Sequence, residues 1–196
     1  MRWFFPGLLP LSIIKWYESS APTAESQDPR TDHYLNLVGS EQMSIKVREG
    51  RLEVKKRYPN VEIAKLHPKV RGHLENWRKW GIDLGNVKRL PSSVSTGTWI
   101  PVTKRRRLCA FQNLSGRWRP VSIDLASFNS GCEMELTTLK VGSQVWWTLA
   151  FEAFGPADRT RAALLSLSAQ IFASLDPPDL STPDSFGYPW WLDQLT

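Results

Sequence analysis

The stretch SIKVREGRLEVKK, residues 44–56, combines five cationic side chains with a regular apolar alternation. The dipeptide Glu49-Gly50 at its centre is typical of a two-residue hairpin turn, because glycine tolerates the positive φ that such turns require. With this turn we predict five cross-strand pairs: Arg48 with Arg51, Val47 with Leu52, Lys46 with Glu53, Ile45 with Val54, and Ser44 with Lys55. One face of the hairpin is then apolar and the other is charged. Alternation alone does not say whether the charged face meets water or the inside of a curved sheet.

Basic residues at alternate positions of several strands can bind a phosphate-rich anion. Side chains two apart on a strand point to the same face, so cations from neighbouring strands converge without being adjacent in sequence. Arginine makes bidentate contacts to phosphate, and lysine supplies a compact positive charge. The candidate ligand-binding residues are Lys46, Arg48, Lys55, Lys104 and Arg106. The alternative is a solvated strand face on which Lys46 and Glu53 form a weak surface pair.

Two carboxylates in the segment CEMEL are candidate metal ligands. Glu133 and Glu135 lie two apart, so on a strand both project from one side, as a hard cation such as Mg²⁺ requires. Beside a bound phosphate, such an ion would neutralise charge and position a water molecule. Pairs of this kind are also common on exposed strands, and a solvated pair is the alternative.

Nucleic acid is a second candidate ligand. The run from Lys104 to Arg107 is dense in cations, and Arg117-Trp118-Arg119 places an aromatic ring between cations, as in proteins that bind single strands. On a strand, however, the basic run divides between the two faces, which weakens this interpretation. The tandem tryptophans at 146–147 and 190–191 are more typical of a core than of a base-stacking surface.

Other site chemistries lack support in the sequence. His33, His67 and His73 have no partner at metal-ligand spacing, and there is no nucleophile elbow or phosphate-cradling glycine loop. Cys109 and Cys132, the only cysteines, are predicted to be free thiols. Free thiols are typical of a reducing compartment, so we expect a cytoplasmic protein.

The composition is that of a folded, basic protein. The chain has 196 residues, ten of them Trp, and a net charge of +6, which favours polyanionic partners. The apolar opening MRWFFPGLLPLSII contains two prolines and lacks a good cleavage site after it, so we interpret it as mature protein. No run of about 18 apolar residues is present, so we predict no membrane partner.

The segments predict a single α+β domain, residues 1–196. We expect an antiparallel, barrel-like sheet, forming a tunnel or half-barrel, with flanking helices. Expected strands are 3–5, one beginning near 33, the hairpin, 98–110, 117–125, 132–140 and 144–154; expected helices are 10–19, 67–80 and 158–175. For the last helix we predict Asp158 as N-cap and Leu164, Leu165, Ile171 and Phe172 on the buried side. Residues 20–32 are a predicted loop, and the proline-rich tail at about 176–196 is predicted to pack its aromatic side chains on the domain.

The order of several motifs resembles that of the CYTH domain, the superfamily of triphosphate tunnel metalloenzymes. HYL at 33–35 resembles its tyrosine-leucine strand, Lys46 and Arg48 its spaced basic pair, and LEVK at 52–55 its strand ending in lysine. VTKRRR at 102–107 resembles its lysine-x-arginine strand, and SID at 122–124 with CEMEL at 132–136 resemble its later acidic strands. The resemblance covers roughly residues 33–140 and depends on the order of these short motifs, which suggests a divergent bacterial branch.

The resemblance implies a basic tunnel that binds a triphosphate or polyphosphate, with Mg²⁺ or Mn²⁺ as cofactor and metal-dependent hydrolysis as an activity. The chain departs from the family at its first strand, where the family has acid-x-acid-x-lysine. Aligned there, MRWFF places Met1 at the second acidic position and Trp3 at the lysine. Either the acidic pair has been lost or it lies upstream of Met1. The alternative function is a noncatalytic interaction protein that binds RNA or a protein partner through the basic strand face.

Overall fold

Long antiparallel strands form one curled half-barrel sheet, flanked by three helices, in the computed structural model, which describes residues 1–85, 99–122 and 129–195. The first part of the chain contains β1 (Arg2–Pro6), α1 (Leu11–Ser20), β2 (Glu25–Ser26), β3 (Arg30–Leu35), β4 (Met43–Arg48), β5 (Arg51–Arg57), β6 (Glu62–His67), β7 (Val70–Leu74) and β8 (Trp77–Asp83). The second part contains β9 (Trp99–Leu114), β10 (Arg117–Val121), β11 (Gly131–Val141), β12 (Gln144–Phe154), α2 (Ala157–Ser174), a 3₁₀ turn (Thr182–Asp184) and α3 (Tyr188–Asp193). The predicted fold class is confirmed.

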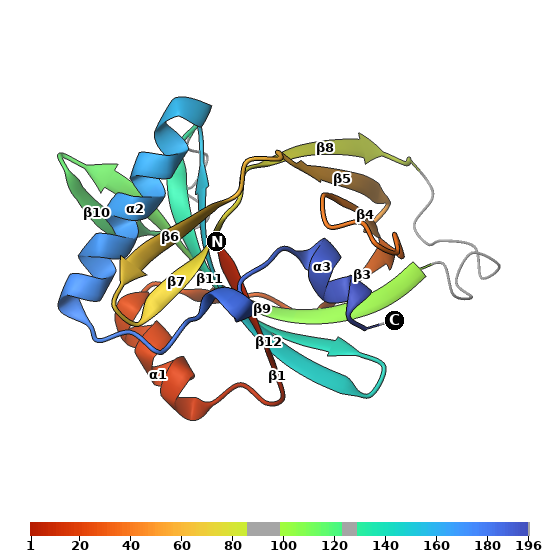
Figure 1. Ribbon diagram of the computed structural model, residues 1–196, viewed down its shortest axis with the longest axis horizontal. Coiled ribbons are helices and arrows are strands. Elements are labelled where there is room, and N and C mark those ends of the chain that lie inside the picture. Colours follow the sequence, from red (N-terminus) through yellow and green to blue (C-terminus); the bar gives the residue numbers. More distant parts are fainter. Residues whose placement is uncertain (86–98, 123–128, 196) are drawn as a thin grey trace.

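The sheet runs in the order β1-β12-β11-β9-β3-β4-β5-β8, with β2 and β10 also paired to β9. Its central strand β9 is the longest, and every pairing in the sheet is antiparallel. Figure 1 shows the sheet curling from β12 and β9 through β3 and β4 to β5 and β8, with α3 lying in the hollow. The pair β6-β7 forms a separate two-stranded sheet. The curl therefore gives the main sheet a concave face on which side chains from many strands can meet.

The β4-β5 hairpin has the predicted register. All five predicted pairs are observed, and Glu49 and Gly50 both have positive φ, as a mirror-image hairpin turn requires. Its charged face is the inner one, because Lys46 is 9% exposed and Glu53 is 2% exposed. Ile45 and Val54, on the opposite face, are only partly buried. The sequence pattern defined the two faces correctly, and the curl of the sheet determines which of them is enclosed.

The predicted helix at 67–80 is wrong. Residues 62–74 form the β6-β7 hairpin, and residues 77–83 form β8, which pairs with β5. The spacing of Val70 and Leu74 fits a helix. On a strand, however, Val70, Gly72 and Leu74 also lie on one face, and in β7 this face is buried. Glycine adds no apolar side chain to the pattern, so the period of two is hidden in the sequence. Two shorter strands therefore replace one helix.

Smaller corrections concern the loop at 20–32 and the start of α2. Within the predicted loop, β2 pairs with β9, and β3 already begins at Arg30. The N-cap of α2 is Pro156 rather than Asp158, which lies in the first helical turn, where a carboxylate interacts favourably with the helix dipole. Leu165 is only partly buried, whereas the other three predicted core positions of α2 are buried. The remaining predicted strands and the helix at 10–19 are observed, and in the strand expected at 117–125 the residues after Ser122 lie outside the described part of the chain.

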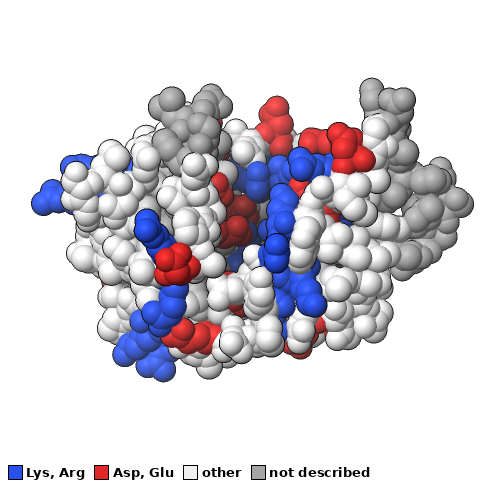
Figure 2. All heavy atoms as spheres, turned by 90° about the horizontal axis from the view of Figure 1, so that it is seen from above, with Lys and Arg blue, Asp and Glu red and all other residues white. Residues whose placement is uncertain are grey.

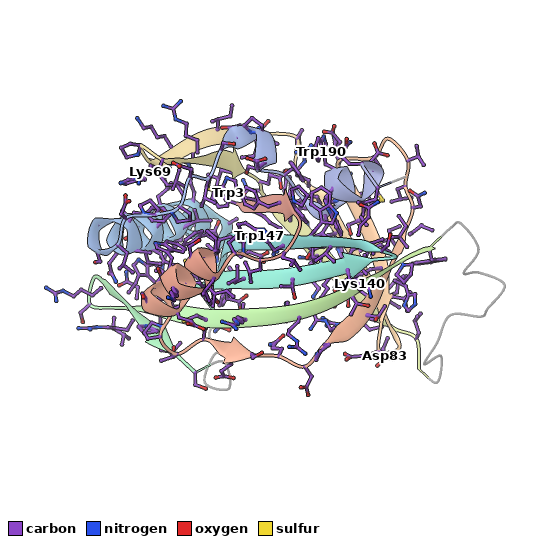
Figure 3. The ribbon with its side chains drawn as sticks, turned by 90° about the horizontal axis from the view of Figure 1, so that it is seen from below. Trp3, Lys69, Asp83, Lys140, Trp147 and Trp190 are labelled. Carbon is purple, nitrogen blue, oxygen red and sulfur yellow. The ribbon has the colours of Figure 1, made fainter. Side chains whose placement is uncertain are left out.

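Two apolar clusters lie on opposite faces of the sheet. The larger one packs α1 and α2 against β9, β11 and β12, and includes Trp3, Trp147 and the two free thiols Cys109 and Cys132. The smaller one lies on the concave face, where the C-terminal segment covers it with Trp191. Figure 3 shows Trp3 and Trp147 on the side of α1 and α2, and Trp190 on α3. The tail is thus packed on the domain, as predicted. No helix of the described residues is long and apolar enough to span a bilayer.

Replacing Gly72 by alanine tests the close approach of β7 to the core. A Cβ atom at Gly72 would lie 2.6 Å from Ser185 Oγ and 2.7 Å from Trp3 Cζ2, both in fully buried residues. We expect Gly72→Ala to lower the free energy of unfolding by about 1–3 kcal/mol, because the packed core resists added volume. At Gly81 the new Cβ would meet only the side chain of the exposed Arg51. Gly81→Ala is the control, and equal losses for both variants in urea unfolding would contradict the tight contact.

Candidate anion-binding cavity

A cavity of about 870 Å³ opens on the concave face of the sheet. Within the described residues, its lining is strongly charged. The cationic side chains are Arg2, Arg30, Lys46, Lys55, Lys79, Lys104, Arg106 and Arg161, and the carboxylates are Glu53, Glu75, Glu135 and Glu152. Figure 2 shows basic side chains beside a hollow in which acidic side chains are visible. Because seven of these cations come from six different strands, the curl of the sheet is what gathers them.

Asp32 is the centre of one ion-pair group. Its Oδ2 atom lies 2.9 Å from Lys46 Nζ and 3.4 Å from Lys104 Nζ, and its Oδ1 atom lies 3.4 Å from Arg30 Nε. Burial alone would raise the pKa of Asp32, but Lys104 and Lys46 outweigh it and lower that pKa to about 2. Lys46 also pairs with Glu53, whose Oε2 atom is 3.1 Å from Lys46 Nζ, so Glu53 belongs to the same group.

Glu53 connects this group to the hairpin and to β8. Its Oε1 atom lies 3.1 Å from both Arg48 Nη2 and Lys79 Nζ. Burial would raise the pKa of Glu53, and the neighbouring Lys46 and Lys79 lower it to about 2 instead. A carboxylate that is 2% exposed therefore stays ionised because three cations from the two neighbouring strands, β4 and β8, surround it.

A second ion-pair group is centred on Glu135 of β11. Arg2 Nη1 lies 2.7 Å from its Oε1 atom, and Arg106 Nη1 lies 3.2 Å from its Oε2 atom. Thr137 donates a further hydrogen bond of 2.8 Å to Oε1. Burial would raise the pKa of Glu135, but Arg2 and Arg106 hold it well below its usual range. Arg2 also contacts Glu152 of β12 at 2.7 Å, so it bridges two strands.

Lys104 lies between the two groups and is enclosed by aromatic rings. Its Nζ atom donates a hydrogen bond of 2.6 Å to the Tyr34 hydroxyl. The same atom lies 3.7 Å from the centre of the Tyr188 ring, which stacks on the Tyr34 ring. Burial lowers the pKa of Lys104 well below its ordinary value, although Asp32 opposes the shift.

The predicted binding residues are brought together only in part. Lys46, Lys55, Lys104 and Arg106 line the cavity, whereas Arg48 lies on the same face but pairs with Glu53 and, at 3.8 Å, with Glu49. Lys46 and Arg106 are also paired with carboxylates, as described above. Lys55 differs from them: it has no ion pair within 4 Å among the described residues, and its cross-strand partner is another cation, Lys79.

The two carboxylates predicted as metal ligands, Glu133 and Glu135, differ in their surroundings. Both oxygens of Glu135 are already engaged by Arg2, Arg106 and Thr137. Glu133 lies on the same face, and burial together with Glu152 and Glu135 raises its pKa. Among the described residues, no three acidic, histidine or cysteine side chains are placed to hold a metal ion. The metal at Glu133 and Glu135 stays a prediction from the family resemblance, and we derive no chemical step through it.

Sequence reasoning missed Asp32, Arg2 and Tyr188 as residues of the site. Asp32 fell in the predicted loop, although it is two residues before Tyr34 and therefore on the same face of β3. In β1, Trp3 points into the larger core, and Arg2 is the cation that faces the cavity. Trp3, which the sequence comparison placed at the lysine position of the family, therefore does not face the cavity. Tyr188 carried no signal, because its position depends on how the tail folds back.

Some of the residues considered for nucleic acid are engaged elsewhere, whereas Arg105, Arg117 and Arg119 are exposed. In the basic run of β9, Lys104 and Arg106 face the cavity, whereas Arg107 pairs with Glu18 of α1 at 2.6 Å. Trp118 is 5% exposed, and its indole donates to Ser166 of α2. It is therefore a core residue of the kind we expected for Trp147 and Trp191, which are also buried.

The chain was also compared with known proteins. No protein-family model, no curated protein and no solved structure matches it.

Replacing Asp32 by asparagine tests the first ion-pair group through its pH dependence. The folded-state pKa of Asp32 is depressed, so its stabilisation is present above the unfolded pKa near 4 and is lost as the pH falls toward 2. We expect Asp32→Asn to be less stable than the natural chain by roughly 2 kcal/mol at pH 6, with the difference shrinking between pH 4 and pH 2. Urea unfolding at pH 6, 4 and 2.5 measures it. Asp28→Asn, at an exposed position of the same segment, is the control. A difference that stays constant down to pH 2.5 would contradict the role of the carboxylate.

Proposed function

We propose that this protein binds a phosphate-rich anion, such as a triphosphate or a short polyphosphate, in the cavity of the concave face. The observation that carries the proposal is the pairing of Lys55 with Lys79 at this cavity. Like charges placed directly opposite on neighbouring strands are destabilising unless something compensates them. Lys79 has Glu53 at 3.1 Å, whereas Lys55 has no carboxylate within 4 Å among the described residues and is attracted only at longer range by Glu152 and Glu133. A bound anion would compensate Lys55 at closer range.

The balance of charge in the cavity supports the same proposal. The ion-pair groups by themselves could be a purely structural network, since several cations already have carboxylate partners. Even so, cations outnumber carboxylates in the described lining, and adding the buried Asp32 behind it leaves a positive excess. Enclosed cations attract anions more strongly than solvated ones, because the surrounding protein screens the charge less than water does. The motif order that resembles triphosphate tunnel enzymes points to the same class of ligand.

Binding of tripolyphosphate to the purified chain, and its loss in Lys55→Ala, tests the proposal. We expect tripolyphosphate to raise the melting temperature of the natural chain, because a ligand that binds only the folded state stabilises it. Lys55→Ala should weaken the affinity about tenfold, as the loss of one charge-assisted contact predicts. Calorimetric titration measures the dissociation constants.

Lys56→Ala is the matched control. Lys56 is the next residue on β5, is exposed and lies on the opposite face, yet its removal changes the net charge by the same amount. We expect its affinity to stay within about twofold of the natural value, because distant surface charges are screened by salt. Equal weakening in both variants would indicate attraction by overall charge and overturn the cavity as the binding site.

The same samples separate hydrolysis and RNA binding from simple anion binding. Release of phosphate from tripolyphosphate in the presence of Mg²⁺ or Mn²⁺, lost in Lys55→Ala, would add hydrolysis to binding. Stabilisation without release supports a binding protein alone. If single-stranded RNA binds while tripolyphosphate has no effect, the noncatalytic RNA-binding alternative replaces our proposal.

A further inference from the structure

Lys104 is the most deeply buried cation in the described lining of the cavity, with 4% of its surface exposed. Its surroundings are specific. The Tyr34 hydroxyl is 2.6 Å from its Nζ atom, the Asp32 Oδ2 atom is 3.4 Å away, and the Tyr188 ring lies over it. The amine thus ends in the cavity beside one hydroxyl and one carboxylate oxygen.

The carboxylate of Asp32 is shared between Lys104 and Lys46, so Lys104 does not have a carboxylate partner of its own. The Asp32 Oδ2 atom lies nearer to Lys46, and Lys46 has a second carboxylate in Glu53. Two buried amines therefore share one carboxylate oxygen, and Lys104 has no other carboxylate within 4 Å among the described residues. Burial is the main reason that the pKa of Lys104 is lowered. A lysine with a lowered pKa gives up its proton more readily, and the amine that remains has a free electron pair and is nucleophilic.

Some of the charged groups around Lys104 raise its pKa and others lower it. Besides Asp32 on β3, Glu135 on β11 raises the pKa of the ammonium group. Lys46 on β4 and Arg2 on β1 lower it. The centres of the Tyr34 and Tyr188 rings lie 4.8 and 3.7 Å from the amine nitrogen. The cations that favour the neutral amine also form the walls to which an anionic ligand would bind.

We propose that Lys104 forms a Schiff base with an aldehyde or ketone that carries a phosphate group. The inference rests on the proposed anion binding, because the phosphate is what would hold the carbonyl compound in the cavity. The amine nitrogen attacks the carbonyl carbon and a C–N bond forms. The carbonyl oxygen gains the protons lost by the nitrogen and leaves as water when the C=N bond forms. The step consumes no oxidant or reductant.

The neighbours of Lys104 select this class of carbonyl compound. The Tyr34 hydroxyl is close enough to carry protons between the nitrogen and the departing oxygen. Asp32 would serve as counter-ion for the protonated imine, whereas it would repel an anionic adduct such as a carbamate. Arg106, two residues along β9 on the same face, and Lys46 are placed to contact the phosphate.

Reductive trapping with glyceraldehyde 3-phosphate tests the inference. The natural chain is incubated at pH 7 with this compound and sodium cyanoborohydride, and the modified lysine is located by peptide mass spectrometry. We expect one adduct per chain, on Lys104, and at least tenfold slower labelling by glyceraldehyde, which lacks the phosphate. Lys104→Arg should lose the adduct, and Lys56→Arg should keep it. Because the site is mapped on the natural chain, the result does not depend on how well the variants fold.

The outcomes separate this inference from the proposed function. Labelling spread over exposed lysines such as Lys15 and Lys140, or no labelling, overturns the Schiff base. If tripolyphosphate still stabilises the chain in that case, anion binding stands. If Lys104 reacts equally fast with glyceraldehyde and its phosphate, and tripolyphosphate has no effect, the amine is nucleophilic but both phosphate proposals are overturned.

Discussion

The concave face of this protein depends on buried charges that compensate one another across strands. An ionised carboxylate removed from water costs several kcal/mol unless cations surround it. Asp32 meets this condition because Lys46 and Lys104 reach it from the strands on either side of β3. A slip of either neighbouring strand by one residue would turn its lysine to the other face and leave Asp32 unpaired. The ion pairs therefore help to set the register of the sheet as well as the chemistry of the cavity.

Aromatic residues of the C-terminal tail pack against these buried charges. Tyr188 stacks on Tyr34, covers the amine of Lys104 and lies 5.1 Å from the guanidinium carbon of Arg2. One ring thus touches residues of β1, β3 and β9. Trp191, three residues further on, packs with Phe4 in the smaller apolar cluster. The packing of α3 therefore keeps water away from the charges, and a loss of packing there would also change the electrostatics of the cavity.

The sequence predicted much of the fold because two signals were strong. The hairpin at 43–57 combines a turn with alternation, so both its register and its two faces followed. The segment at 67–80 failed because Gly72 leaves the alternation invisible, while Val70 and Leu74 also fit a helix. A local sequence pattern shows how side chains are spaced within one segment. It does not show which residues of another strand will lie opposite that segment in the sheet.

The site was predictable only where its residues form a pattern of their own. Lys46 and Lys55 belong to the hairpin, so their common face could be derived. Asp32 and Arg2 are single charges in segments with little pattern, and their importance comes from partners distant in the sequence. The predicted anion-binding set was therefore all cationic, and Glu135 was predicted as a metal ligand, whereas the structure shows it in ion pairs. The structure adds Asp32 and the tyrosines, which help to make such a set stable when it is enclosed.

The positions of the cations also bear on the two proposed ligands. Lys55 lies on β5 and Arg106 on β9, with β3 and β4 between them. Neighbouring strands are about 4.8 Å apart, so the two backbone positions are separated by roughly 14 Å along the curved sheet. On the concave face, long side chains from such strands converge, and the charges of Lys55 and Arg106 both lower the pKa of Glu133. The proposed polyphosphate and the proposed phosphate-carrying carbonyl compound therefore share the cations of one cavity and compete for them.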